Sequence, residues 1–168
     1  MFAKEVYWQR RKMLRAAVGD GVILIAGNEE SSMNYGANTY HFRQDSSFLY
    51  FFGINKPGFY GICDVDNDKD ILFGDDFTID DIIWMGEQLS VSDLAGQVGV
   101  ESSAALGDLS KVLKLALEGG RKVHILPPYR GDHIIKLSQL IGVSHKEVNR
   151  LVSQELIQAV VKLRAVKD

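Results

Sequence analysis

The chain has 168 residues, a net charge of −3 at pH 7, 24% charged residues and 46% hydrophobic residues. These values are typical of one ordinary globular domain, and a chain of this length buries enough surface to fold without disulfides or a metal. The small negative charge argues against a general nucleic-acid-binding protein, because such proteins carry a surplus of Lys and Arg on one face.

The chain opens with charged residues rather than an apolar signal sequence, and no apolar run approaches the roughly 20 residues that span a bilayer. Its single cysteine, Cys63, cannot form an internal disulfide. We therefore expect a cytoplasmic protein with no membrane partner. No His lies near Cys63 in sequence, so we expect a small buried hydrophobic residue rather than a nucleophile.

Residues 4–18 are predicted to form an amphipathic helix. Val6, Tyr7, Met13, Leu14 and Val18 would share its apolar face. The basic run at residues 10–12 is expected to lie on the solvated face of this helix. The continuous apolar run at residues 22–26 is typical of an interior strand that is covered on both faces.

The middle of the chain is predicted to be rich in strands. Residues 48–52 are apolar and aromatic, so we expect a strand with Phe48, Tyr50 and Phe52 on one core face. Residues 60–66 and 71–73 are expected to pair as an antiparallel hairpin around an acidic turn. A ligand platform built from the aromatic side chains is the weaker alternative.

The second half alternates helices with one strand. Helices are expected at residues 80–87, 91–98, 108–118, 132–140 and 144–165, and a strand at residues 123–126. Strands that alternate with helices, interrupted by one hairpin, favour an α/β domain with a mixed β-sheet flanked by helices on both faces.

The motifs of common catalytic sites are missing from the sequence. It has no P-loop, no dinucleotide-binding glycine pattern after a strand, no nucleophile elbow and no His-Glu-x-x-His. Of the four histidines, we expect His124 to be a hydrogen-bonded core residue and His145 to lie at the surface in the first turn of a helix. His41 and His133 carry no specific signal.

Aspartates recur at positions 64, 66, 68 and 70, which raises the possibility of a calcium loop. The run lacks the Gly and Glu of an EF-hand, so we favour a solvated hairpin turn. The pairs at 75–76 and 80–81 flank an expected helix start, where they would serve as caps.

One stretch carries the character of a known family. It begins with Tyr40-His41-Phe42-Arg43-Gln44-Asp45-Ser46-Ser47, continues through the aromatic run to Gly53, and is followed by Pro57-Gly58, Leu72-Phe73 and Trp84-Met85-Gly86. In this order and spacing the sequence resembles the N-terminal domain of aminopeptidase P and prolidase, relatives of creatinase with a pita-bread catalytic domain. The resemblance covers essentially the whole chain and is most specific over residues 40–86.

The resemblance implies a two-domain Xaa-Pro peptidase of the metallopeptidase class. Residues 1–150 would be the accessory domain, and residues 151–168 would begin a linker helix into an absent C-terminal catalytic domain. That domain would hold two divalent metals, usually Mn, and cleave the bond before a proline in second position. By resemblance, the accessory domain supports homo-oligomerisation and walls in an active site. This chain would then be inactive alone and hold neither catalytic residues nor a metal.

Arg43 and Asp45 are candidate contact residues because they stand two apart before the expected strand and would point to one side. They would either carry charge toward the catalytic domain or substrate, or form an ion pair that orders the loop. By resemblance, Trp84 would reach a partner subunit's active-site mouth; the alternative is a core Trp packed beside Met85.

Three functions remain open at this point. The leading interpretation is the accessory domain of an Xaa-Pro aminopeptidase, and the next is that of a prolidase, which cleaves only dipeptides. The third interpretation belongs to a different functional class: a non-catalytic peptide-binding module, since one fold can host unrelated functions.

Overall fold

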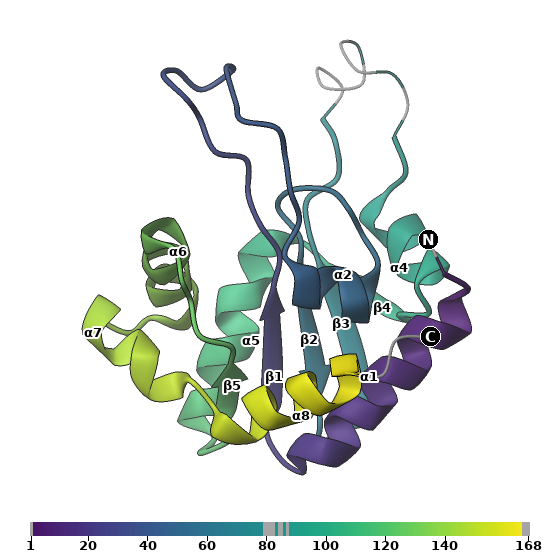
Figure 1. Cartoon of the computed structure of the whole chain (residues 1–168), viewed down its shortest axis with the longest axis vertical. Helices are drawn as coiled ribbons and strands as arrows, with labels where there is room; N and C mark the ends of the chain where they lie inside the picture. Colours follow the sequence, from purple (N-terminus) through teal and green to yellow (C-terminus); the bar gives the residue numbers. More distant parts are fainter. Residues whose placement is uncertain (1, 79–82, 84–85, 87, 166–168) are drawn as a thin grey trace.

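A five-stranded mixed sheet forms the centre of the computed structural model, which describes residues 2–78, 83, 86 and 88–165. The strand order is β4-β3-β2-β1-β5 (Figure 1). The strands are β1 (Val22–Ala26), β2 (Tyr60–Asp64), β3 (Lys69–Phe73), β4 (Ser102–Ala104) and β5 (Val123–Ile125). The antiparallel pairs β1–β2 and β2–β3 lie between two parallel pairs, β1–β5 and β3–β4.

Helices cover both faces of the sheet. One hydrophobic cluster packs α1, α2, α4 and α8 on one face, and a second packs α5, α6 and α7 on the other. The helical elements are α1 (Lys4–Val18), α2 (Ser46–Phe52), α4 (Val91–Gln97), α5 (Leu106–Glu118), α6 (Gly131–Ile141), α7 (His145–Val148), the short 3-10 helix η1 (Asn149–Leu151) and α8 (Gln154–Ala165). The predicted fold class, a mixed sheet with helices on both faces, is confirmed.

The strand β1 sits inside the sheet and joins both cores. Ile23 and Ile25 belong to the cluster on the α1 side, and Val22 and Leu24 belong to the cluster on the α5 side. Successive side chains of a strand point to opposite faces, so a strand covered on both sides must be apolar at every position. The prediction from its unbroken apolar run is therefore confirmed, as is the hairpin of β2 and β3.

The prediction of a strand over residues 48–52 is wrong, because this segment is the helix α2. Its buried aromatic residues are Phe48, Phe51 and Phe52, the i, i+3, i+4 spacing of a helix face. Asp45 caps the N-terminus, and Gly53 ends the helix in a left-handed conformation with φ of 68°. The expectation that the aromatic residues are core is confirmed for Phe48 and Phe52, which reach it from a helix, whereas Tyr50 is only half-buried.

The expected solvated basic face of α1 is also wrong for two of its three residues. Arg11 is 0% exposed and Arg10 is buried, whereas Lys12 is exposed as expected. The Arg11 guanidinium donates to the carbonyls of Phe51 at 2.8 Å and of Val98 at 2.9 Å, near the C-terminal ends of α2 and α4. Helix C-terminal ends favour cations, and burial here is offset by these hydrogen bonds.

The acidic hairpin is less solvated than predicted. Asp64 and Asp66 both accept hydrogen bonds from Arg121, which precedes β5. Asp70 is buried and pairs with two arginines of α1. Asp75 and Asp76 do cap helices, as expected, but the helices are α5 and α4. The helix predicted at 80–87 and the pair Asp80-Asp81 fall largely or wholly outside the described residues.

The C-terminal segment is interrupted, where one helix over residues 144–165 was predicted. Val152 forms a bridge to Ile125, and Ser153 then caps α8 by accepting a hydrogen bond from Leu156 N–H at 3.1 Å. The hydroxyl of Ser153 also lies 2.8 Å from Nδ1 of His124, a buried residue as predicted. Pairing with the sheet therefore breaks the helix.

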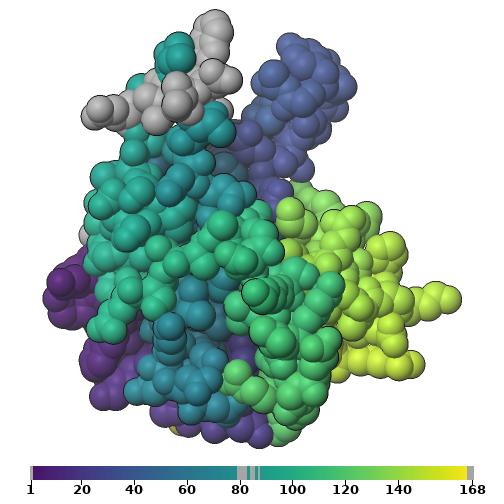
Figure 2. Space-filling view, turned by 180° about the vertical axis from the view of Figure 1, so that it is seen from behind, coloured from purple at the N-terminus to yellow at the C-terminus, as the bar shows by residue number. Residues whose placement is uncertain are grey.

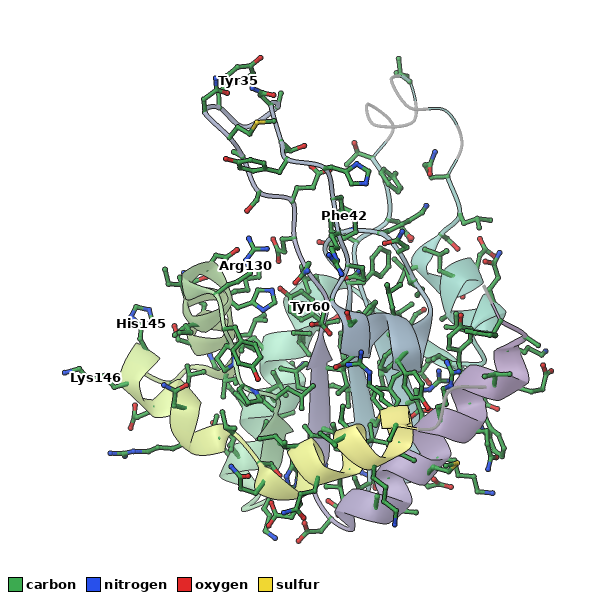
Figure 3. The ribbon with its side chains drawn as sticks, viewed as in Figure 1. Tyr35, Phe42, Tyr60, Arg130, His145 and Lys146 are labelled. Atoms are coloured by element: carbon green, nitrogen blue, oxygen red, sulfur yellow. The ribbon has the colours of Figure 1, made fainter. Side chains whose placement is uncertain are left out.

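Two smaller expectations are confirmed. Cys63 is fully buried, and burial raises the pKa of its thiol well above the ordinary value. His145 is exposed in the first turn of α7, whose N-cap is Ser144, and Figure 3 shows it pointing away from the body.

Among the helices of the described part of the chain, none is long and apolar enough to cross a membrane.

Candidate functional site

Two connections leave the same end of the sheet (Figure 1). One is residues 27–45, between β1 and α2, and the other lies between β3 and α4, where the structure describes residues 74–78 and 88–90 at this end. The candidate contact residues Arg43 and Asp45 lie at the base of the first connection, which makes this end, the loop end, the candidate site. Loops held by a rigid scaffold are common places for binding residues.

A finger at residues 31–40 forms the outer part of the loop end. A bridge between Ser32 and Thr39 closes its base, and Met33 N–H donates to the Asn38 carbonyl at 2.8 Å. The finger stands clear of the body (Figure 2), and its tip carries the exposed Tyr35 (Figure 3). The finger thus presents an aromatic side chain on a loop whose shape is held by its own backbone hydrogen bonds.

Buried Gln44 fixes the base of the connection. Its carbonyl oxygen accepts from Asn28 N–H at 2.6 Å and from Asp45 N–H at 2.9 Å. Its amide nitrogen donates to the Lys56 carbonyl at 2.7 Å, so one side chain joins three segments. Gln44 is not among the candidate residues predicted from the sequence, and its place between two of them in the family motif is the signal that points to it.

Asp45 has a local structural role. Its carboxylate accepts from Ser47 N–H at 2.8 Å and from Phe48 N–H at 2.9 Å, which satisfies the first donors of α2. Arg43 is exposed, and its backbone carbonyl accepts from the Asn28 side chain at 2.7 Å. Within the described part of the chain, no ion pair joins Arg43 to Asp45. The structure therefore does not bring the two charged groups together.

Arg43 lines a small hollow of about 290 Å³ beneath the finger. The other lining residues are Glu29, Ser31, Tyr40, His41, Phe42 and Arg130. Arg130 donates to Ser31 at 2.8 Å and to Asp132 at 2.7 Å, which ties the finger to the start of α6. Burial alone would raise the pKa of Asp132, but the hydrogen bonds from Arg130 outweigh it and lower that pKa.

A buried tyrosine supports the floor of this region. Tyr60 donates its hydroxyl to Glu29 at 2.8 Å, and Lys136 of α6 lies 3.1 Å from the same carboxylate. Burial, with the hydrogen bond to Glu29, raises the pKa of Tyr60 far above its ordinary value. The phenol therefore stays protonated and acts as a fixed donor.

The loop end offers hydrogen-bond donors, cations and aromatic surface, which suit recognition. Over residues 2–78 and 88–165, no group of three or more His, Cys, Asp or Glu is placed to hold a metal ion. The residues present therefore do not fit a di-metal centre, and no catalytic step is assigned to them. The third candidate residue, Trp84, lies outside the described residues.

A sequence model of the family "Aminopeptidase P, N-terminal domain" matches residues 7–126. The chain belongs to this family. The match includes all of the sheet, most of α1, all of α2 and both connections at the loop end, so the resemblance inferred from the motif around Arg43 and Asp45 is confirmed.

The relatives of this aminopeptidase P-type domain include Xaa-Pro dipeptidases and probable Xaa-Pro aminopeptidases. The chain is 26% identical over 149 residues to a human Xaa-Pro dipeptidase, and the alignment covers 86% of this chain and 29% of the relative. It is 25% identical over 159 residues to a probable Xaa-Pro aminopeptidase of Aspergillus niger, covering 95% of this chain and 31% of the relative. The chain thus spans about a third or less of the length of these curated relatives.

Solved structures share the fold. Aminopeptidase P from E. coli in its low-pH form superposes with a TM-score of 0.71 at 21% identity, covering 89% of this chain and 35% of that one. The Pseudomonas aeruginosa aminopeptidase PepP gives a TM-score of 0.69 at 22% identity, with coverages of 89% and 34%. At this identity the likeness shows the fold alone.

Proposed function

We propose that this domain is the non-catalytic N-terminal part of a metal-dependent Xaa-Pro aminopeptidase, which removes the residue before a proline in second position. The observation that carries the proposal is the family match over residues 7–126, supported by relatives named for Xaa-Pro peptidase activity. Residues 1–150 form the accessory domain in this proposal, and residues 151–168 begin the linker.

Catalysis in this proposal belongs to a C-terminal domain that the relatives have length to accommodate. That domain would hold two divalent ions, which we propose to be Mn, and the metal-activated oxygen chemistry would take place there. The 168-residue chain alone is then inactive, and we place the enzyme in the cytoplasm as a homo-oligomer.

The loop end is proposed to wall an active site. Arg43 is exposed beside the finger, so its charge is available to a peptide or to a neighbouring domain. Asp45 contributes by fixing the start of α2, and Trp84 is proposed to reach the site mouth from the second connection. A prolidase is the second candidate, because a human Xaa-Pro dipeptidase is among the relatives.

The first test compares this chain with the complete polypeptide that its gene encodes. The complete polypeptide with Mn²⁺ is expected to cleave an Xaa-Pro-Yaa tripeptide, and the 168-residue chain is expected to be inactive. Cleavage of Xaa-Pro dipeptides alone would favour the prolidase candidate. A gene product no longer than this chain would contradict the proposal.

A charge reversal then tests the loop end. Arg43→Glu in the complete polypeptide is expected to lower kcat/KM at least about tenfold, which corresponds to about 1.4 kcal/mol. Lys146→Glu, which reverses an exposed cation on α7, is the matched control and should leave kcat/KM unchanged. Equal kcat/KM values for both variants, with unchanged melting temperatures, would show that Arg43 is not part of the functional surface.

A further inference from the structure

Two adjoining hollows follow the contact between α2 and α8, on the face of the molecule opposite α5. Their volumes are about 680 Å³ and 420 Å³. Both are lined by Ser46 of α2 and by Val160, Val161 and Arg164 of α8. We call this continuous depression the α2–α8 furrow.

The furrow exposes apolar surface at its centre. Leu156, Ala159 and Val160 bury one side of α8 in the core, while Val161 on the outer side is 65% exposed. Tyr129, which lines the smaller hollow, is 90% exposed. Apolar side chains gathered along a groove, with polar groups around it, are the pattern of a contact surface.

The furrow is bordered by positive charge. Arg10 and Arg164 line the larger hollow, and Arg164 also lines the smaller one together with Arg130, whose charge is balanced by Asp132. The one carboxylate among the lining residues, Asp45, is occupied in capping α2. A second copy docked face to face would bring these cations together, which is costly, so a partner with carboxylates around an apolar element fits better.

The position of α8 indicates which partner this is. Ala165, the last residue of α8, lines the furrow itself. A domain that follows α8 in the chain, as the proposed function requires, would start beside the furrow, and such tethering raises the effective concentration, so even a modest surface would stay occupied.

We propose that the α2–α8 furrow is the seat of the domain that follows α8, and that it receives an apolar element flanked by carboxylates. This inference rests on the proposed function, since it requires a C-terminal domain. It gives the linker helix a second role, because α8 supplies Val161 and Arg164 to the interface as well as connecting the two domains.

Thiol labelling at one position tests the proposal. Val161→Cys is introduced into the 168-residue chain and into the complete polypeptide, and modification at position 161 is followed by peptide mass spectrometry. Leu115→Cys is the matched control, since Leu115 is an apolar residue of α5 that is 58% exposed on the other face. Native Cys63, which is fully buried, reports any unfolding.

The expected result is that the thiol introduced by Val161→Cys reacts at least about tenfold more slowly in the complete polypeptide than in the 168-residue chain, because a covered thiol reacts only after local opening. The thiol introduced by Leu115→Cys should react equally in both. Equal reactivity at position 161 in an active complete polypeptide would overturn the furrow proposal and leave the proposed function standing. Protection of position 161 already in the 168-residue chain would overturn it in favour of self-association.

A charge placed in the furrow gives an independent measurement. Val161→Asp should leave the melting temperature of the 168-residue chain unchanged, because the side chain is exposed there. In the complete polypeptide it should separate one thermal transition into two, whereas Leu115→Asp should not. A single unchanged transition with Val161→Asp would count against the furrow as the interdomain contact.

Discussion

Replacing Arg11 with Met should strongly destabilise this domain. The guanidinium is fully buried, lies 2.8 Å from the buried carboxylate of Asp70, and donates to three backbone carbonyls near the ends of α2 and α4. Removing one partner of a buried ion pair costs about 3–5 kcal/mol, because the remaining charge stays buried. Arg15 continues to pair with Asp70, which reduces the cost of leaving the Asp70 charge buried, but the three carbonyls lose their donor. We expect a total loss of about 3–5 kcal/mol.

Urea unfolding followed by circular dichroism measures this loss. At an m-value of about 2 kcal/mol/M, the midpoint should fall by about 1.5–2.5 M. Lys12→Met is the matched control, since Lys12 is the exposed neighbour on the same helix, and it should change the unfolding free energy by less than about 0.5 kcal/mol. A loss below about 1 kcal/mol for Arg11→Met would refute the reasoning that this arginine clamps α1 to the helix ends.

Three further predictions concern the same domain. Asp45→Ala should cost about 1 kcal/mol through loss of the α2 cap, whereas Asp45→Asn should cost a few tenths; equal losses in urea unfolding would contradict the cap. Cys63 should resist a thiol reagent at pH 8 and react only in urea, because burial raises the pKa of its thiol; rapid labelling of folded protein would disprove this. Burial alone would raise the pKa of Asp64, but hydrogen bonds from Arg121 and Asn67 outweigh burial and lower that pKa. The free energy of unfolding should therefore decrease as pH falls from about 5 toward the pKa of folded Asp64. Arg121→Gln should flatten this pH dependence between about pH 6 and pH 3, and an unchanged slope would show that the Arg121–Asp64 pair does not contribute to it.

Patterns that depend on neighbours along the chain could be predicted from the sequence. The unbroken apolar run of β1 identified a strand covered on both faces, and the acidic turn identified the hairpin of β2 and β3. The motif from Tyr40 to Gly86 identified the family, because it records spacing rather than three-dimensional contact. Of the candidate site, the motif drew attention to Arg43 and Asp45 without revealing that their charged groups are apart.

The aromatic run of α2 shows where such patterns fail. Five consecutive apolar residues are compatible with a strand or a short buried helix, and β-favouring aromatic residues tipped the prediction toward a strand. The decisive signals were Asp45 and Gly53 at the two ends, whose capping roles depend on the backbone conformation that packing selects.

The sequence by itself determined the family, the α/β class, the buried interior strand β1 and the most specific motif. Only the tertiary structure decided that Arg11 is a buried clamp, because its partners lie 40 to 88 positions away in the chain. The same holds for the α2–α8 furrow, whose walls come from helices about a hundred residues apart. Local periodicity reports which face of an element is apolar, but whether a charged face meets water or the carbonyl ends of other helices depends on how the chain folds back on itself.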